Sequence, residues 1–285
     1  MKATTRALRT PHSELRTLRG LSIGVVGAGK MGQAMIGGLL ARGVPRRAIR
    51  AAEASGRTRA EVSRRFRIRV TSDGAAVARG ADVVILAVKP QQVVEALRQI
   101  GPALRSRQLV VSIAAGLTTR WLERRLPAVP VVRVMPNLPA TVSCGFSAIA
   151  PGRRATARHR AIAHALFSAV GEAVELPERA FDAVTAVSGS GPAYVFLLVQ
   201  MWEEAARSLG LPAAVAGRAI RATLAGSTRL LRASGEPADV LVQQVASKGG
   251  TTEAALKVLA KRRVSAAFAE ALRAAARRSK QLAKT

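Results

Sequence analysis

The sequence predicts an α/β protein, with a doubly wound, mainly parallel sheet in its N-terminal part and an all-helical C-terminal part. Short apolar segments alternate with segments of helical periodicity as far as residue 176, and only helical periods and glycine-rich joints follow Pro177. Near-continuous apolar strands separated by helices are typical of a parallel sheet that is covered on both faces. We therefore expect a sheet domain at 21–177 and a helical domain at 178–285.

The apolar segments are short and rich in Val, Ile and Leu, as expected for buried strands. The chain also shows no internal repeat and no low-complexity tract that would suggest another architecture. The predicted strands are 21–26, 49–52, 83–88, 109–113, 131–134 and 173–176.

Composition limits the class of protein. At 285 residues, with 49% hydrophobic and 22% charged residues, the chain has the size of two domains and the balance of a soluble globular protein. No uninterrupted apolar run reaches about 18 residues, so we expect no membrane partner. The single cysteine, Cys144, cannot form an internal disulfide, which favours the cytoplasm. Without a cluster of Cys and His residues, we expect no metal site.

The formal net charge is +28, from 45 Lys and Arg against 17 Asp and Glu. Basic residues are scattered along most of the chain, and aromatic residues make up only 3% of it, too few for a base-stacking surface. We interpret the charge as a solvated basic surface and expect no nucleic-acid partner, although the same field would attract an anionic cofactor and substrate.

Residues 1–20 are basic and contain no continuous apolar stretch, so they do not form a secretory signal. We expect them to be a disordered N-terminal extension, with the fold beginning at Leu21.

A glycine-rich turn lies between the predicted strand 21–26 and an apolar helix that runs through Leu40. Its G-x-G-x-x-G spacing, after a strand and before a helix, is typical of a dinucleotide-binding Rossmann domain. The glycines permit a tight turn, a close approach to a pyrophosphate and close packing of the helix on the strand. The cofactor-binding residues predicted here are Gly27, Ala28, Gly29, Lys30, Met31 and Gly32.

Glu53 ends the second predicted strand, where an acidic residue that binds the adenosine ribose is expected. A carboxylate there favours NADH because it repels a 2′-phosphate. Ser55, Arg57 and Arg59 follow at once and together could hold that phosphate. Between NADH and NADPH, we expect NADPH or the use of both cofactors.

Two turns in the C-terminal half combine glycines with hydroxyl groups. Residues 188–194 read Ser-Gly-Ser-Gly-Pro-Ala-Tyr, directly before an apolar helix at 195–209, and residues 247–252 read Ser-Lys-Gly-Gly-Thr-Thr, before another helix. Proline suits the first helical turn, and a serine before it can cap free N–H groups. We expect each turn to form an anion-binding helix N-terminus. The structural alternative for Thr251 and Thr252 is that they only cap the helix.

These motifs, in this order and spacing, resemble those of the pyrroline-5-carboxylate reductase family, from about residue 21 to the C-terminus. The nucleotide turn is shared by many dehydrogenases, whereas the two glycine-hydroxyl turns are much more specific. The resemblance is carried by GAGKMG at 27–32, AVKP at 87–90, VRVMPNLPA at 132–140, FDAVTAVSGSGPAY at 181–194 and SKGGTTEAAL at 247–256.

The resemblance implies reduction of 1-pyrroline-5-carboxylate to L-proline by NADPH or NADH, the last step of proline biosynthesis. It also implies a homodimer formed through the C-terminal domain, often assembled into a larger ring such as a decamer. The chain departs from the family pattern at Leu138, where threonine is more common, at Lys248, where proline is common, and at Gln244, where relatives carry asparagine.

The resemblance also implies roles for individual residues. Thr252 would lie closest to the ring nitrogen, and it and Ser190 are the predicted catalytic residues. The substrate carboxylate would bind the N–H groups of the second turn. The predicted substrate-binding residues are Ser247, Gly249, Gly250, Thr251, Thr252, Gly191, Pro192 and Val245; further cofactor-binding residues are Ala87, Val88, Lys89, Pro90, Asn137 and Gln244.

Two other interpretations stay open from the sequence. A β-hydroxyacid-type dehydrogenase would need a catalytic lysine on the helical domain, for which Lys248 and Lys257 are the candidates. A basic nucleotide-sensing or nucleic-acid-binding protein would keep the cofactor fold without activity, and would be retained on DNA in a salt-dependent way.

Overall fold

The structure is a computed structural model that describes residues 15–282. It divides into two compact units. The first, here called the sheet unit, comprises Met1–Gly189 and Ala276–Thr285; the second, the helical unit, comprises Ser190–Ala275.

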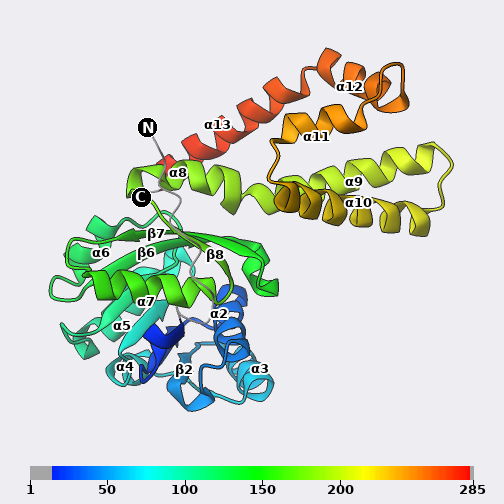
Figure 1. Ribbon diagram of the computed structural model, residues 1–285. Coiled ribbons are helices and arrows are strands. Elements are labelled where there is room, and N and C mark those ends of the chain that lie inside the picture. Colours follow the sequence, from blue (N-terminus) through cyan, green and yellow to red (C-terminus); the bar gives the residue numbers. More distant parts are fainter. Residues whose placement is uncertain (1–14, 283–285) are drawn as a thin grey trace. The chain divides into compact units, whose positions relative to one another are not determined.

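The sheet unit contains one sheet with helices packed on it (Figure 1). The sheet has eight strands in the order β3-β2-β1-β4-β5-β6-β7-β8. Neighbouring strands are parallel except for β6 and β7, which are antiparallel. The strands are β1 Ile23–Val26, β2 Ile49–Ala52, β3 Arg69–Thr71, β4 Val83–Leu86, β5 Leu109–Ser112, β6 Val131–Pro136, β7 Gly145–Pro151 and β8 Gly171–Glu175. The helices of this unit are α2 Lys30–Ala41, α3 Gly56–Phe66, α4 Gly74–Arg79, α5 Val93–Ile100, α6 Thr119–Arg125, α7 Ala157–Ser168 and α8 Phe181–Val184.

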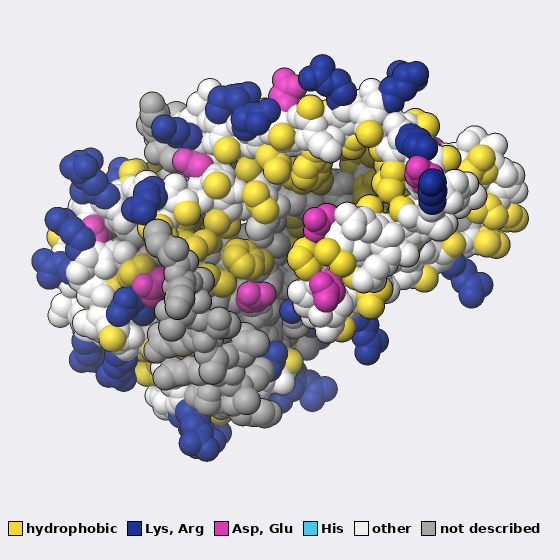
Figure 2. Space-filling model, turned by 45° about the horizontal axis from the view of Figure 1, so that its top comes forward, with side chains coloured by type: hydrophobic (Ala, Val, Ile, Leu, Met, Phe, Trp, Pro, Cys, Tyr) yellow, Lys and Arg dark blue, Asp and Glu magenta, His cyan; other side chains and the backbone are white. Residues whose placement is uncertain are grey.

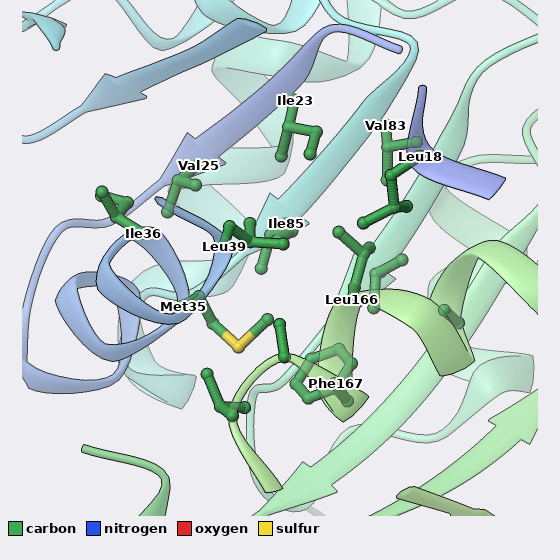
Figure 3. Close-up of a cluster of buried hydrophobic side chains, with 14 of the residues drawn as sticks. Leu18, Ile23, Val25, Met35, Ile36, Leu39, Val83, Ile85, Leu166 and Phe167 are labelled. Atoms are coloured by element: carbon green, nitrogen blue, oxygen red, sulfur yellow. The ribbon is translucent and has the colours of Figure 1, made fainter. Parts of the chain in front are cut away.

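The central strands β1, β4 and β5 are buried on both faces. Successive residues of a strand point to opposite faces, so neighbouring residues of one strand belong to different cores. On one face, Ile85 of β4 belongs to a core with Met35 of α2 and Phe167 of α7 (Figure 3). On the other face, Leu86 belongs to a second core with Ile100 of α5. The doubly wound, mainly parallel fold predicted from the apolar strands is therefore confirmed.

Two strands were missed. β3 is only three residues long and none of its residues is fully buried, so it carries no apolar run. β7 follows a 3-10 helix and pairs antiparallel with β6, placing Ile149 opposite Val134. A pairing of this kind depends on the path of the connecting loop, which local periodicity does not report.

The fold begins earlier than Leu21. Leu15–Leu18 forms a 3-10 helix, and the Leu18 side chain is buried in the same core as Ile23 and Val83. The predicted disordered extension is therefore wrong for residues 15–20. The remainder of that prediction, residues 1–14, lies outside the described residues.

The helical unit is a set of helices with little core of its own. Ala206 of α9 packs with Ala216 and Ile220 of α10, and an ion pair of 3.1 Å joins Arg221 to Glu203. Edge-to-face packing of Tyr194 and Phe268, with ring centroids 5.8 Å apart, joins α9 to α13. The helices are α9 Gly191–Ser208, α10 Ala213–Ser234, α11 Ala238–Val245, α12 Thr251–Lys261 and α13 Val264–Leu282, whose last residues belong to the sheet unit.

Large apolar side chains are exposed on the helical unit. Phe196 of α9 is 60% exposed, and Leu230 of α10 and Val258 of α12 are exposed to a similar degree. Figure 2 shows such hydrophobic side chains in yellow on the surface of this unit. Soluble monomers rarely expose contiguous apolar patches of this kind, which usually mark an interface.

The same region contains a segment that passes a simple test for a membrane span. Residues 178–208 run helically for 31 residues with a mean hydropathy of 1.3 in the best window, enough by length and composition alone to cross a bilayer. No other helix among the described residues passes this test. The expectation of no such stretch rested on counting uninterrupted apolar residues, a stricter criterion than the average over a window.

Candidate functional site

The glycine-rich turn joins β1 to α2 and has the geometry that a dinucleotide requires. Gly27 has φ +94°, and a Cβ there would lie 2.7 Å from the backbone of Ala87. A Cβ on Gly32 would lie 2.2 Å from the Gly27 carbonyl oxygen, whereas a Cβ on Gly29 would meet nothing within 4 Å. Gly27 and Gly32 are thus required by packing, and Gly29 leaves open space beside the start of α2. A phosphate fits there, because the first N–H groups of a helix lack internal partners.

The turn lies where the strand order changes direction. β2 lies on one side of β1 and β4 on the other, so the carboxyl ends of β1 and β4 form the topological switch point of the sheet. In such sheets ligands bind in the crevice at that point. Ala87–Pro90 follows β4 there, and the Ala87 N–H donates to the Val26 carbonyl oxygen at 2.7 Å.

Glu53 lies beside this turn, at the end of β2. Its Oε2 accepts from the Ala28 N–H at 2.9 Å, and its Oε1 accepts from the Ser55 N–H at 2.9 Å. The structure therefore brings the predicted ribose-binding carboxylate to the glycine-rich turn. Arg59 donates to the carbonyl oxygens of Glu53 and Ala54, at 2.9 and 2.6 Å.

Asn137 follows β6 and uses both ends of its side-chain amide. Its Oδ1 accepts from the Phe146 N–H at 2.9 Å, and its Nδ2 donates to Ser188 Oγ at 3.0 Å. The residue thereby joins the ends of β6 and β7 to the first glycine-hydroxyl turn.

The sequence predicted a capped helix start at the first glycine-hydroxyl turn, and this prediction is wrong. Thr185–Gly189 forms a π-helical turn that continues α8 and leads into α9. Ser190 already has helical angles and makes no capping hydrogen bond with its side chain. The expected free N-terminus is absent because the preceding helical turns continue into it. π-Helical turns inside α-helices are rare and are frequent at functional sites.

The two glycines of this turn differ. A Cβ on Gly189 would lie 2.7 Å from the Met135 side chain, whereas a Cβ on Gly191 would meet nothing within 4 Å. Gly189 therefore permits close packing on β6, and Gly191 leaves an open backbone at the start of α9.

The second glycine-hydroxyl turn connects α11 to α12 in the helical unit. Gly249 has φ +74°, and Gly250 is the N-cap of α12 without a side-chain cap, so neither Thr251 nor Thr252 fills the capping role. The Gly250 N–H donates to the Ser247 carbonyl oxygen at 3.0 Å, which closes the turn. Val245 ends α11 just before it and is exposed, as is Gln244.

Glu253 is a residue of this turn that the sequence reasoning missed. Its Oε2 accepts from the Gly249 N–H at 2.6 Å, and its Oε1 forms an ion pair of 2.9 Å with Lys257. The hydrogen bonds from Lys257 and from Gly249 hold the pKa of Glu253 below its ordinary 4.5. A glutamate three positions after a helix N-cap is the sequence signal for such a contact.

A buried ion pair was also missed. Arg133 of β6 is buried, and its guanidinium lies 3.0 Å from Glu178 Oε1 and over the Phe181 ring. Glu178 also accepts from the Thr119 N–H and hydroxyl, at 2.8 and 2.7 Å. This cluster attaches the segment that leads into α8 to β6 and to the start of α6.

The predicted site residues thus fall into two groups. Residues of the glycine-rich turn, Glu53, 87–90 and Asn137 belong to the sheet unit, whereas Ser190–Pro192 and 244–252 belong to the helical unit. Among the described residues, no three His, Cys, Asp or Glu side chains are grouped so that they could hold a metal ion.

Comparisons with known proteins agree with these features. A family model described as pyrroline-5-carboxylate reductase dimerisation matches residues 178–282, and one described as NADP oxidoreductase coenzyme F420-dependent matches residues 22–116. The chain is 43% identical to pyrroline-5-carboxylate reductase of Pseudomonas aeruginosa, over 92% of this chain and 96% of that protein. It is 37% identical to the Arabidopsis thaliana enzyme of the same name, over 92% and 96% of the two chains.

Solved structures of such enzymes have the same fold. The pyrroline-5-carboxylate reductase of Coxiella burnetii superposes with a TM-score of 0.87 at 33% identity, over 93% of this chain and 99% of that one. The Plasmodium falciparum pyrroline carboxylate reductase, solved with NADP bound, superposes with a TM-score of 0.83 at 27% identity, over 93% and 98% of the two chains.

The Rossmann sheet, its open glycine-rich turn and the helical domain define an oxidoreductase that uses NAD(P)H. The extent and identity of the matches narrow that class to one family. The chain belongs to the pyrroline-5-carboxylate reductase family.

Proposed function

We propose that this chain reduces 1-pyrroline-5-carboxylate to L-proline with NAD(P)H, as the last step of proline biosynthesis, using the residues assigned below. The substrate is a cyclic imine, and its protonated form is already an electrophile. Hydride adds to ring C5 of this protonated imine and the π electron pair of the C=N bond moves to nitrogen, which gives the secondary amine; a proton from solvent then gives its ammonium form. The protein must therefore mainly orient the ring and exclude water.

The cofactor would be held by the sheet unit and supplies the hydride when bound. The N–H groups at the start of α2 would bind its pyrophosphate beside Gly29, and Glu53 would bind the adenosine ribose. The segment Ala87–Pro90 would border the nicotinamide half, because it follows β4 at the switch point. The open space at Gly29 and the position of Glu53 support this assignment.

The substrate carboxylate would bind the second glycine-hydroxyl turn. The Gly250 and Thr251 N–H groups stand at the N-terminus of α12, where backbone dipoles favour an anion. The Ser247 and Thr252 hydroxyls would add hydrogen bonds, with Thr252 nearest the ring nitrogen. The absence of a side-chain cap on α12 supports this role for the Thr251 N–H, whereas the Gly250 N–H already donates to the Ser247 carbonyl oxygen.

Ser190 to Pro192 would form the facing wall of the substrate pocket. The open backbone at Gly191 supports this assignment, since a substrate ring could approach it without a clash. Asn137 would act mainly by holding Ser188, and through it this wall. Gln244 and Val245 would border the pocket from the end of α11.

The protein is a homo-oligomer, and its subunits would meet through the helical unit. The exposed apolar side chains of α9, α10 and α12 support this interface, as does the match of residues 178–282 to a dimerisation model. The interface also accounts for the apolar character of 178–208 without a membrane. We further propose that the dimers assemble into a ring such as a decamer, and that the enzyme is cytoplasmic.

An assay of NAD(P)H oxidation with 1-pyrroline-5-carboxylate tests this function. The purified protein should be active, and Thr252→Ala should lower kcat/KM at least tenfold, about 1.4 kcal/mol, through the loss of one hydrogen bond to a charged group. Thr228→Ala, on α10, is the matched control and should keep full activity. No oxidation of either cofactor would refute the function, and an unchanged rate in Thr252→Ala would remove that residue from the site.

A further inference from the structure

We propose that Glu53 makes this enzyme prefer NADH to NADPH, because its carboxylate is anchored where a 2′-phosphate would have to bind. The proposal rests on the proposed function only in that the chain binds a nicotinamide dinucleotide through its glycine-rich turn. It departs from the expectation of NADPH or dual use, which assumed that Ser55, Arg57 and Arg59 could all turn to the phosphate.

The Glu53 carboxylate is fixed at both oxygens. Oε2 accepts from the Ala28 N–H of the glycine-rich turn at 2.9 Å, and Oε1 accepts from the Ser55 N–H at 2.9 Å. A carboxylate with one anchor could rotate away from an incoming phosphate. One with two backbone anchors would have to break hydrogen bonds to do so, and would leave two N–H groups without partners.

The anchored carboxylate still has room for a ribose. An ionised carboxylate offers about four acceptor sites, two on each oxygen. The two backbone N–H groups use one site on each oxygen, so one site on each stays available. This matches the 2′- and 3′-hydroxyls of an unphosphorylated ribose, which are donors.

The groups expected to bind a 2′-phosphate are mostly engaged elsewhere. Arg59 donates from Nη1 to the carbonyl oxygens of Glu53 and Ala54, at 2.9 and 2.6 Å, which holds its guanidinium against the end of β2 and leaves only Nε and Nη2 for a phosphate. The Ser55 hydroxyl accepts from the Thr58 N–H at 3.3 Å and caps α3. Arg57 makes no hydrogen bond or ion pair within residues 15–282 and is exposed.

The balance of charges then decides the preference. A 2′-phosphate would meet a carboxylate that must break two hydrogen bonds to move away, with the exposed Arg57 and the remaining donors of Arg59 to compensate it. Like charges in contact are unfavourable, whereas an exposed ion pair contributes little. The carboxylate therefore favours NADH in two ways: it accepts hydrogen bonds from the ribose hydroxyls of NADH, and it repels the 2′-phosphate of NADPH.

This preference does not follow from the relatives. The Plasmodium falciparum enzyme was solved with NADP bound, and the model matching residues 22–116 is described as an NADP oxidoreductase. The inference depends on the contacts of Glu53 and Arg59 in this chain.

The test measures binding of ligands that lack the nicotinamide, so that it does not depend on the reaction. Dissociation constants of the full-length protein for ADP and for 2′,5′-ADP are determined by calorimetry, followed by those for NADH and NADPH. We expect ADP to bind at least about tenfold more tightly than 2′,5′-ADP, and NADH to be preferred in the same sense. Equal binding, tighter binding of 2′,5′-ADP, or no binding of either nucleotide would overturn the proposal.

The variant Glu53→Gln tests the cause. It removes the charge and keeps the side-chain size, so 2′,5′-ADP should bind at least about tenfold more tightly than it does to the unmodified protein. If the substitution merely perturbed the fold, both ADP and 2′,5′-ADP would bind more weakly, and that outcome would count against the proposal. Glu61→Gln, an exposed residue of α3, makes the same charge change as a control and should leave the ratio unchanged.

The nucleotide measurements separate this inference from the proposed function. A protein that binds ADP preferentially but does not oxidise NADH with 1-pyrroline-5-carboxylate would keep the preference and refute the reaction. A protein that catalyses the reaction with NADPH as its better cofactor would support the proposed function and refute the preference for NADH.

Discussion

The side-chain amide of Asn137 donates to Ser188 Oγ at 3.0 Å, and this contact ties the end of β6 to the π-helical turn that precedes α9. Because the Asn137 Oδ1 also accepts from the Phe146 N–H, the amide cannot rotate without losing both hydrogen bonds. The turn that leads to Ser190 is therefore positioned by a residue remote in sequence.

Loss of this contact should lower activity more than stability. Asn137→Ala and Ser188→Ala each remove the hydrogen bond between the two side chains, and Asn137→Ala also removes the acceptor for the Phe146 N–H. We expect each to lower kcat/KM at least tenfold while changing the free energy of unfolding by about 1 kcal/mol. The double variant should be little worse than either single one, because both remove the same hydrogen bond. Additive losses in kcat/KM would show that the two residues act separately.

The glycines of the nucleotide turn should separate into two classes. Gly32→Ala places a Cβ 2.2 Å from the Gly27 carbonyl oxygen, so it should destabilise the fold by about 2 kcal/mol or more. Gly29→Ala meets nothing within 4 Å, so it should leave the melting temperature unchanged but weaken NADH binding, because the methyl group occupies the space of the phosphates. Thermal unfolding and fluorescence titration measure the two effects. Normal NADH affinity in Gly29→Ala would mean that the pyrophosphate lies elsewhere.

The ion pair between Arg133 and Glu178 should be worth far more than an exposed one. The Arg133 side chain is 6% exposed, so removing the Glu178 carboxylate leaves the Arg133 charge inside the protein without its partner. Glu178→Ala should therefore cost about 3 kcal/mol in unfolding free energy. The pair Arg160–Glu175 has a similar length of 3.2 Å, but both side chains are more than 40% exposed, so Glu175→Ala should cost less than about 1 kcal/mol. Equal costs in denaturant titrations would contradict the role of burial.

The order of the second glycine-hydroxyl turn should depend on pH through Glu253. Its pKa lies below the ordinary 4.5, so the carboxylate stabilises the turn fully above that value and loses the effect as the pH falls through the folded-state pKa. Glu253→Gln should speed hydrogen exchange of the Gly249 N–H at pH 7, and the difference from the unmodified protein should vanish in acid. A difference that persists at low pH would show that the charge is not responsible. One molar salt should reduce the contribution of Lys257.

The apolar surface of the helical unit should hold the subunits together. Phe196→Glu places a charge on α9, where Phe196 is 60% exposed, and should shift the protein to smaller species in sedimentation experiments. Val94→Glu, at a side chain of α5 that is 47% exposed, makes a similar change on the sheet unit and should leave the assembly intact. An unchanged oligomer in Phe196→Glu would place the interface elsewhere.

Much of the fold was predictable from local pattern. β1, β4 and β5 are uninterrupted apolar segments, and each is buried along its length, because a central parallel strand is covered on both faces. The glycine-rich turn was predictable for a similar reason, since its spacing follows from the backbone it must form. β3 and β7 were not, because their pairing depends on neighbours supplied by distant parts of the chain.

The candidate site divides in the same way. Residue types and spacing indicated the nucleotide turn, Glu53 and the two glycine-hydroxyl turns, and the resemblance of these motifs to a known family indicated the family. Two features required the folded chain: the π-helical turn held by Asn137, and the hydrogen bond from the Ala28 N–H to the Glu53 carboxylate. The contact of Glu253 with Gly249 is local and had a sequence signal that was missed. Local patterns record backbone conformation and burial, whereas most of these features depend on which groups remote segments bring within hydrogen-bonding distance.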